Sequence, residues 1–122
     1  MRVLVVDDEP IVLKSCRLVI EAEGWEMISA SSVAEALSIL ESITPELLLV
    51  DVKMPVHDGM YLMRKVREKR PGIPIIVMSG YATSETIKEA EGLGAAIFLP
   101  KPFTPDELAD TLKSVAKSSS QD

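Results

Sequence analysis

MRVLVVDDEP, residues 1–10, places four consecutive apolar residues directly before three acids and a proline. The run Val3–Val6 is too short for a helix and does not alternate with polar residues, which is typical of a strand covered on both faces. Pro10 suits the first turn of a helix. The stretch therefore predicts a buried strand that ends in acids and leads into a helix.

Four similar apolar runs follow at fairly even spacing, namely Met27–Ala30, Leu47–Val50, Ile75–Met78 and Ala95–Leu99. Helical patterns with recognisable caps, prolines and glycines separate them. These patterns run from Pro10 to Gly24, from Ser32 through Leu40, from after Gly59 to Pro71-Gly72, from Thr83 or Ser84 to near Leu93-Gly94, and onward from Thr104. The alternation predicts an α/β fold, a (βα)5 doubly wound five-stranded parallel sheet with helices on both faces.

The charge balance argues against some classes of partner. Nineteen acids and thirteen bases give the 122-residue chain a net charge of −6, which disfavours direct binding of nucleic acid or of anionic lipid by charge. The longest apolar run, Ala95–Leu99, is far shorter than the ~18 residues of a membrane span, and no signal peptide opens the chain. We expect a cytoplasmic protein without membrane contact.

The rarest residue types narrow the class of site. A single cysteine, Cys16, excludes an internal disulfide, and with His57 as the one histidine the chain has no zinc pattern.

The length fits one domain, which we place at residues 1–117. Residues 118–122 are predicted to be a polar tail or the start of a linker.

Polar residues follow the predicted strands at the ends where an open doubly wound sheet binds ligands. Asp7-Asp8, Asp51, Ser79 and Lys101 hold these positions. A dinucleotide or P-loop site would have glycines after the first strand, whereas two acids there suit a hard cation such as Mg²⁺. The alternative that Asp8 and Glu9 only favour a helix N-terminus leaves Asp51 and Lys101 unexplained.

A carboxylate at a strand end beside a metal can accept a phosphoryl group. Such a transfer needs the charge of the phosphoryl oxygens neutralised by the metal on one side and a fixed cation on the other. Lys101 would supply that cation, and Ser79 a hydroxyl that hydrogen-bonds a phosphoryl oxygen. The residues therefore favour phosphoryl chemistry at Asp51.

Four segments together resemble the signatures of receiver domains of bacterial two-component response regulators. They are Val6–Glu9 (VDDE), Asp51–Pro55 (DVKMP) with Asp58-Gly59, Met78–Gly80 (MSG) and Lys101–Phe103 (KPF), and they occur in the family's order and spacing over essentially the whole chain. The resemblance implies a flavodoxin-like fold with strand order 2-1-3-4-5. It also implies a domain that is phosphorylated and then switches conformation to regulate an output.

The resemblance assigns a role to each acid. Asp51 would be the phosphoacceptor and, with Asp8, a direct ligand of Mg²⁺, for which Mn²⁺ can substitute. The main-chain carbonyl of Lys53 would add a ligand, and Asp7 would act largely through water. Lys53 and Tyr81, each two residues beyond a site residue, would tune the lifetime of the phosphoryl group.

The remaining site residues follow in the same way. Ser79 and Lys101 would hold the phosphoryl group, and the Lys101–Pro102 peptide bond would be cis. Ser79 and Phe98 would form the conformational switch, with phenylalanine where tyrosine is commoner in the family. A homodimer through the face of the fourth helix, fifth strand and fifth helix stays open, although Ala95–Ile97 lacks the acids that winged-helix relatives use there.

The implied partner is a sensor histidine kinase or a phosphotransfer protein. The chain would then be no enzyme, beyond self-catalysed phosphoryl transfer and slow autodephosphorylation. One alternative is a phosphatase of the haloacid dehalogenase type, which requires a second acid two residues after the nucleophile, where this chain has Lys53. Another is a docking module independent of phosphorylation, although such domains usually lose an acid or the lysine.

Overall fold

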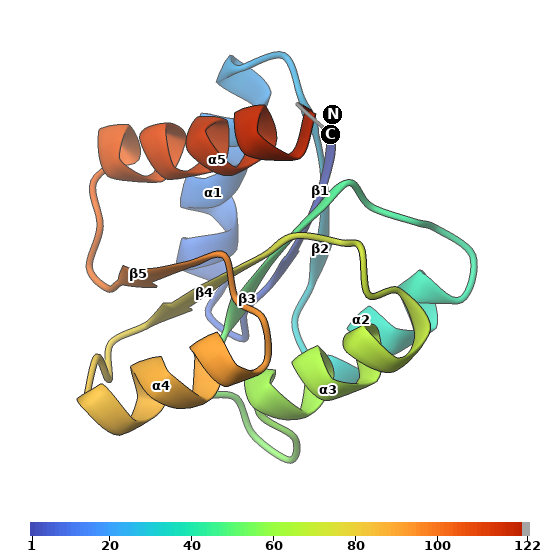
Figure 1. Ribbon diagram of the computed structural model, residues 1–122. Helices are drawn as coiled ribbons and strands as arrows, with labels where there is room; N and C mark the ends of the chain where they lie inside the picture. Colours follow the sequence, from blue (N-terminus) through green and yellow to red (C-terminus); the bar gives the residue numbers. More distant parts are fainter. Residues whose placement is uncertain (121–122) are drawn as a thin grey trace.

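The computed structural model describes residues 1–120, with side chains through Ala116, as one five-stranded parallel sheet between two layers of helices (Figure 1). The strands are β1 Arg2–Val6, β2 Glu26–Ala30, β3 Leu47–Asp51, β4 Ile75–Ser79 and β5 Ile97–Pro100. The helices are α1 Pro10–Ala22, α2 Val33–Leu40, α3 Gly59–Lys69, α4 Ser84–Gly92 and α5 Pro105–Ser120. The strand order β2-β1-β3-β4-β5 confirms the predicted topology.

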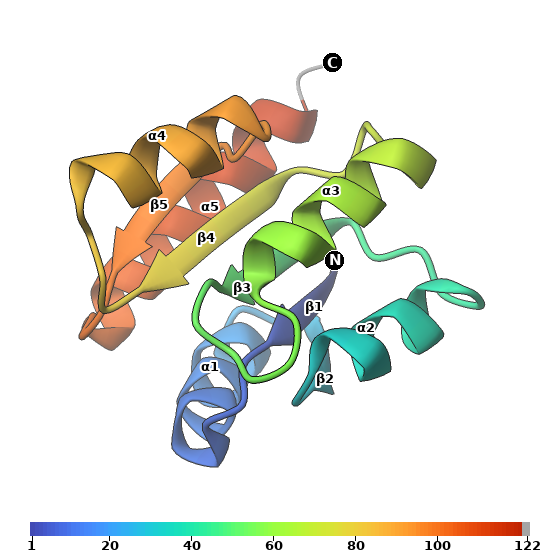
Figure 2. The same ribbon diagram turned by 90° about the horizontal axis from the view of Figure 1, so that it is seen from below.

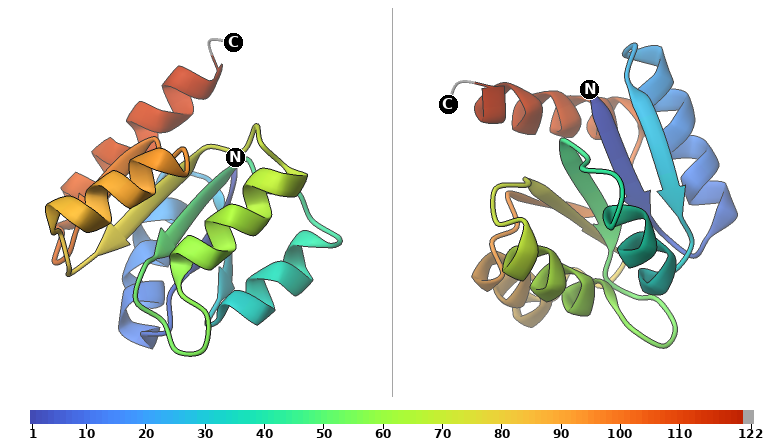
Figure 3. Two further views of the ribbon diagram at one scale, coloured as in Figure 1. Left: turned by 60° about the horizontal axis from the view of Figure 1, so that its bottom comes forward. Right: turned by 90° about the vertical axis from the view of Figure 1, so that its right-hand side faces the viewer.

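Two apolar clusters, one on each face of the sheet, form the core. Leu4, Val6, Leu48 and Val50 point toward the layer of α2, α3 and α4, whereas Val3, Val5, Leu47 and Leu49 point toward α1 and α5. Both layers are visible from two directions in Figure 3. Burial on both faces explains why the strands read as unbroken apolar runs.

The helix caps follow the sequence signals at α2 and α5. The Ser32 side chain accepts a hydrogen bond from the Glu35 amide, and Thr104 and Glu107 each accept one from the other's amide. These bonds satisfy donors that the first helical turn leaves free. The cap at α5 is a reciprocal capping box, whereas at α2 the Glu35 carboxylate accepts from the Ser31 amide, one residue before the N-cap.

Two predicted boundaries were wrong. The fifth strand begins at Ile97, because the Ala95 amide still donates to Ala90 O and completes the C-terminal turn of α4. Helix α3 starts at Gly59 itself and not after it, because the Asp58 side chain caps the helix by accepting from the Tyr61 amide.

The C-terminal end of the chain was expected to be a polar tail or the start of a linker from residue 118 onward. Backbone residues 118–120 continue α5, and residues 121–122 lie outside the described part of the chain. None of the helices within the described residues combines the length and the apolar composition of a bilayer span.

The sheet register brings the predicted site residues to one edge. Val6, the last residue of β1, pairs with Val50, so Asp7 and Asp51 follow on adjacent strands. Asp51 pairs with Met78, and Ser79 with Pro100. The carboxyl ends of β1, β3, β4 and β5 therefore gather the acids, the hydroxyl and the lysine.

Candidate functional site

Four acids cluster at this edge: Asp7, Asp8, Glu9 and Asp51 each offer a carboxylate oxygen, and these oxygens lie within 4.8 Å of one another. Asp7 and Asp51 are buried, whereas Asp8 and Glu9 are exposed. The Asp7 amide donates to Ala30 O, which ties the turn after β1 to the end of β2. The cluster thus has a buried inner half and an outer half open to solvent.

Lys101 supplies the cation of the site. Its ammonium lies 2.7 Å from Asp7 Oδ2, 3.3 Å from Glu9 Oε1 and 3.4 Å from Asp51 Oδ2. Its backbone amide donates to Ser79 O at 2.8 Å, and the Lys101–Pro102 peptide bond is cis. One mobile charge therefore touches three carboxylates that come from two strand ends.

Burial dominates the electrostatics of the inner acids. It raises the pKa of Asp51 from its ordinary 3.8 to about 6, and the nearby charge of Asp7 adds to this, against the lowering effect of Lys101. Burial also raises the pKa of Asp7. For Lys101, burial lowers the pKa, but the hydrogen bond to Asp7 and the charges of Asp51 and Asp7 outweigh it, and the net pKa is raised.

The donor set fits a hard divalent cation. Four carboxylates against one ammonium leave a formal charge of −3 when all are ionised. Oxygen ligands with part of the site open to water are what Mg²⁺ prefers. The excess charge and the solvent-facing Asp8 therefore suit a metal that keeps several waters.

Ser79 and Phe98 lie on neighbouring strands. Ser79 is fully buried, and its Oγ accepts a hydrogen bond from the Tyr81 amide at 2.9 Å. Phe98 pairs in register with Val77, two residues before Ser79, and is half-buried on the cluster under α2, α3 and α4. The hydroxyl is thus fastened to the loop before α4.

Lys53 and Tyr81 come together above the site from two different loops. The Lys53 ammonium lies 4.8 Å from the centre of the Tyr81 ring, a cation–π distance. The Lys53 amide is 3.4 Å from Asp51 Oδ1, and the Tyr81 side chain is 59% exposed. The pair therefore bridges the loops that follow Asp51 and Ser79.

A family model, described as the response regulator receiver domain, matches residues 3–113. This chain belongs to that family. It is a receiver domain of the kind found in two-component response regulators, as the sequence motifs predicted.

Relatives and solved structures agree with this assignment. Sporulation initiation phosphotransferase F of Bacillus subtilis is 31% identical over 112 residues, which cover 92% of this chain and 90% of that protein. The crystal structure of a CheY-like receiver domain protein from Methanospirillum hungatei JF-1 superposes with a TM-score of 0.94 at 32% identity, and the match covers 98% and 96% of the two chains.

Other relatives are much longer than this chain. The regulatory protein AtoC of Escherichia coli is 36% identical over 107 residues, which cover 88% of this chain but 23% of AtoC. Receiver domains as a family are phosphoacceptors that use Mg²⁺ at an acidic site and partner with histidine kinases or phosphotransfer proteins.

Two residues of the receiver site were missed at the sequence level. Glu9 joins the acid cluster and contacts Lys101 across 92 positions of the chain. Gly59 packs so closely on the end of β3 that a Cβ there would lie 2.3 Å from Asp51 O. The acid run at Asp7–Glu9 could have indicated the first, and Gly59 lies within the Asp58-Gly59 signature, but the sequence does not show how closely this glycine packs on Asp51.

The loop between β3 and α3 is strained at its tip. The His57 amide donates to Pro55 O, which closes a tight γ-turn around Val56 with φ +69°. Val56 is 96% exposed, so no packing compensates for this conformation. His57 is exposed, and its ring stacks on that of Tyr61 with 4.0 Å between the ring centres.

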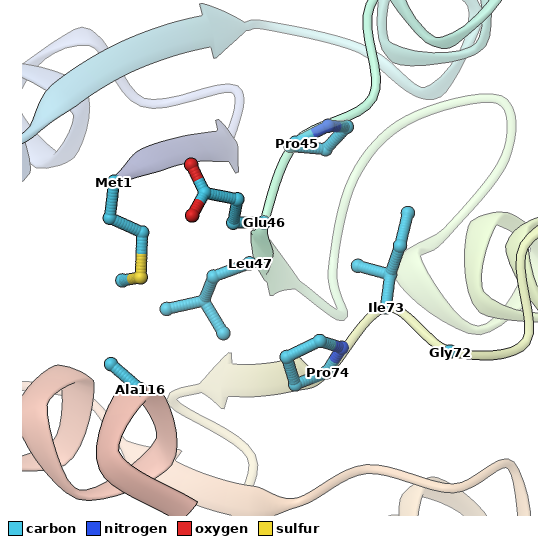
Figure 4. A pocket seen from close by; sticks show the side chains of 8 residues that line it. All are labelled: Met1, Pro45, Glu46, Leu47, Gly72, Ile73, Pro74 and Ala116. Carbon is cyan, nitrogen blue, oxygen red and sulfur yellow. The ribbon is translucent and has the colours of Figure 1, made fainter. Parts of the chain in front are cut away.

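A pocket of about 330 Å³ opens at the opposite end of the sheet (Figure 4). It is lined by Met1, Pro45, Glu46, Leu47, Gly72, Ile73, Pro74 and Ala116. One carboxylate among apolar and main-chain surfaces offers no counterpart to the acid cluster. The pocket therefore lies apart from the acid cluster and differs from it in chemical character.

Proposed function

We propose that Asp51 is the phosphoacceptor of this receiver domain. The observation that carries the proposal is the buried Asp51 carboxylate, which shares the Lys101 ammonium with Asp7 at the end of the sheet. An ionised Asp51 oxygen attacks the phosphorus of a donor phosphohistidine, the P–N bond breaks, and the imidazole leaves with a proton. The pKa of about 6 leaves most of Asp51 ionised at neutral pH.

Asp8, Asp51 and the main-chain carbonyl of Lys53 would hold Mg²⁺ or Mn²⁺, with Asp7 acting through water. The metal would neutralise charge on the phosphoryl oxygens. The net negative charge of the acid cluster and the exposure of Asp8 support this assignment. The buried Asp7 instead holds Lys101 in place through the 2.7 Å contact.

Lys101 and Ser79 bind the new phosphoryl group in this proposal. The Lys101 ammonium already lies within 3.4 Å of the carboxylates of Asp7, Glu9 and Asp51. It is therefore close enough to Asp51 to exchange part of its contact with the other two acids for a phosphoryl oxygen. Ser79 turns its hydroxyl toward the phosphoryl group as a donor and gives up the Tyr81 amide. The space it vacates lets Phe98 rotate inward.

The Lys53–Tyr81 pair would control loss of the phosphoryl group. The Lys53 ammonium lies over the Tyr81 ring, and held in this way the two side chains would cover the approach to Asp51. A covered acyl phosphate meets attacking water less often. Tyr81 would thereby lengthen the lifetime of the phosphorylated state.

A groove of about 440 Å³ beside the site suits the phosphoryl donor, a histidine kinase or phosphotransfer protein. It runs between α1 and the loop after β5 and is lined by Glu9, Ile11, Val12, Ser15, Gly80, Lys101, Pro102 and Phe103. Ile11 is 73% exposed, and Lys101 reaches from this groove to Asp51. A donor helix seated in this groove would present its phosphohistidine to Asp51. The face formed by α4, β5 and α5 would then stay free for an output partner or a homodimer.

The decisive experiment uses Mg²⁺ and acetyl phosphate, with intact-mass detection. The wild-type chain should gain one phosphoryl group that hydroxylamine removes, and Asp51→Asn should gain none. Asp110→Asn, on an exposed position of α5, is the matched control and should behave as wild type. The same adduct on Asp51→Asn would refute the assignment, and sustained turnover of a phosphate monoester would favour the phosphatase alternative.

A further inference from the structure

Arg67, near the end of α3, binds four backbone carbonyls with its guanidinium. Nε donates to Leu93 O at 3.1 Å, and the other two nitrogens donate to Pro71 O, Ile73 O and Gly94 O at 2.7–2.9 Å. Because the guanidinium is planar and rigid, four such bonds fix their partners relative to one another. The described contacts of Arg67 are thus with main chain.

These carbonyls belong to two segments, the loop between α3 and β4 and the end of α4, which meet at the end of the sheet far from Asp51. Pro71 follows α3, Ile73 precedes β4, and Leu93 and Gly94 end α4. A cation there also faces the negative ends of both helix dipoles. Gly94 has φ +88°, and a Cβ on it would lie 2.9 Å from Arg67 Nε, so the glycine leaves room for this contact.

The rest of α4 is weakly attached. Of its nine residues, all within the described chain, Ala90 is the one fully buried, and it lies in the C-terminal half. One turn before Arg67, Arg64 reaches α4 through an exposed ion pair with Glu89 at 2.9 Å. Such exposed pairs contribute little. The firm attachment of α4 therefore lies at its C-terminal end.

The N-terminal end of α4 is linked to the phosphorylation site. It follows the exposed loop 80–83, whose Tyr81 amide donates to the Ser79 hydroxyl. When Ser79 turns toward a phosphoryl group, as in the proposed function, that bond is lost. Figure 2 shows α3 and α4 side by side on one face of the sheet, running in the same direction.

We propose that Arg67 is the pivot about which α4 rotates on phosphorylation. The C-terminal end, Leu93-Gly94, stays bonded to Arg67, while the end at Ser84 moves with the loop released by Ser79. The inference rests on the proposed function of Asp51 and specifies how its signal reaches the surface. From Ser84 to Gly92 the helix axis is ~12 Å long, so each 10° of rotation about Gly92 moves Ser84 by ~2 Å.

The experiment measures two distances by pulsed electron resonance between pairs of spin labels. Both pairs share a label at Ser38→Cys on α2, and the second label is at Glu85→Cys or at Glu91→Cys, all exposed positions. The native Cys16 is buried, and burial raises its pKa to about 12, so it does not take up the label. Beryllofluoride serves as the phosphoryl mimic, and ¹⁹F NMR reports its binding.

In the wild-type background, beryllofluoride should change the distance to residue 85, while the displacement at residue 91 should be roughly one-seventh as large. Arg67→Lys keeps the charge but cannot bond four carbonyls at once, so in this variant the distance to residue 91 should also shift or broaden. Arg64→Gln is the matched control and should leave residue 91 in place.

Two results in the wild type would overturn the pivot: equal displacement at both ends, or bound beryllofluoride with no displacement at residue 85. A distance to residue 91 that Arg67→Lys leaves unchanged would also refute it. If Arg67→Lys does not fold, the two distances measured in the wild type still test whether α4 pivots about its C-terminal end. Failure of beryllofluoride to bind would instead refute the proposed function of Asp51, which is a distinguishable outcome.

Discussion

Replacing Asp51 with asparagine should stabilise the metal-free domain at neutral pH. Burial, and then the charge of Asp7, raise the pKa of Asp51 from 3.8 to about 6 in the folded chain, so the fold binds the proton more tightly than the unfolded chain does. Stability from this group is present below pH ~4 and is lost as the pH rises through 6. Above that range the ionised carboxylate destabilises the fold.

The expected size of the effect follows from the pKa difference. About two units at 1.36 kcal/mol each give ~3 kcal/mol, which Asp51→Asn should recover because its amide is neutral at every pH. For a domain of this size that corresponds to a rise in Tm of roughly 10 °C. The gain should be near zero at pH 4, where Asp51 itself is mostly protonated.

The assay is thermal unfolding with a chelator present, at pH 4 and pH 7.5. Asp110→Asn on the exposed face of α5 removes the same charge away from the site, and its free energy of unfolding should change by less than ~0.5 kcal/mol. A gain for Asp51→Asn that is equal at the two pH values would contradict the linkage argument. A lower Tm at pH 7.5 would show that the contacts of the Asp51 carboxylate outweigh its burial.

Four further predictions concern single residues. Mg²⁺ at a hundredfold excess over its Kd should raise the free energy of unfolding of the wild type by ~2.7 kcal/mol and so raise its Tm, and Asp8→Ala should abolish this response in a melting titration. Tyr81→Ala should shorten the phosphoryl lifetime, and hydrolysis as slow as in the wild type would argue against shielding. Val56→Gly should raise the free energy of unfolding by ~1 kcal/mol in denaturant titrations, since it relieves the positive φ and removes no contact. Ser79→Ala should accept the phosphoryl group yet lose most NMR shifts along residues 87–98; a full shift pattern would disprove the coupling.

The strands could be predicted from the sequence because burial on both faces leaves a direct signature. Runs such as Leu47–Val50 have no alternation, and each strand observed begins or ends within two residues of its predicted bound. The bounds of the fifth strand were predicted least well, because Ala95 and Ala96 are apolar and small enough to end a helix as well as to extend a strand. Composition alone does not separate the two uses.

The site was predictable as a set of residue types at strand ends, but not as a set of contacts. The pairing of Lys101 with Glu9, the closeness of Gly59 to the Asp51 carbonyl and the four bonds of Arg67 all depend on how distant segments pack. Arg67 in particular reads as a surface base in the last turn of a helix. Two of its partners, Pro71 and Ile73, lie in the following loop, and the other two, Leu93 and Gly94, come from the distant end of α4.

The pocket in Figure 4 has a consequence for how the domain can be joined to others. Met1 and Ala116 both line it, so the start of the chain and the last turns of α5 lie together at the end of the sheet opposite Asp51. Termini placed this way tolerate fusion, insertion into a host protein and circular permutation. A neighbouring domain attached here leaves the acid cluster, the groove beside α1 and the face of α4 uncovered, so the same unit can be combined with many outputs without rebuilding its chemistry.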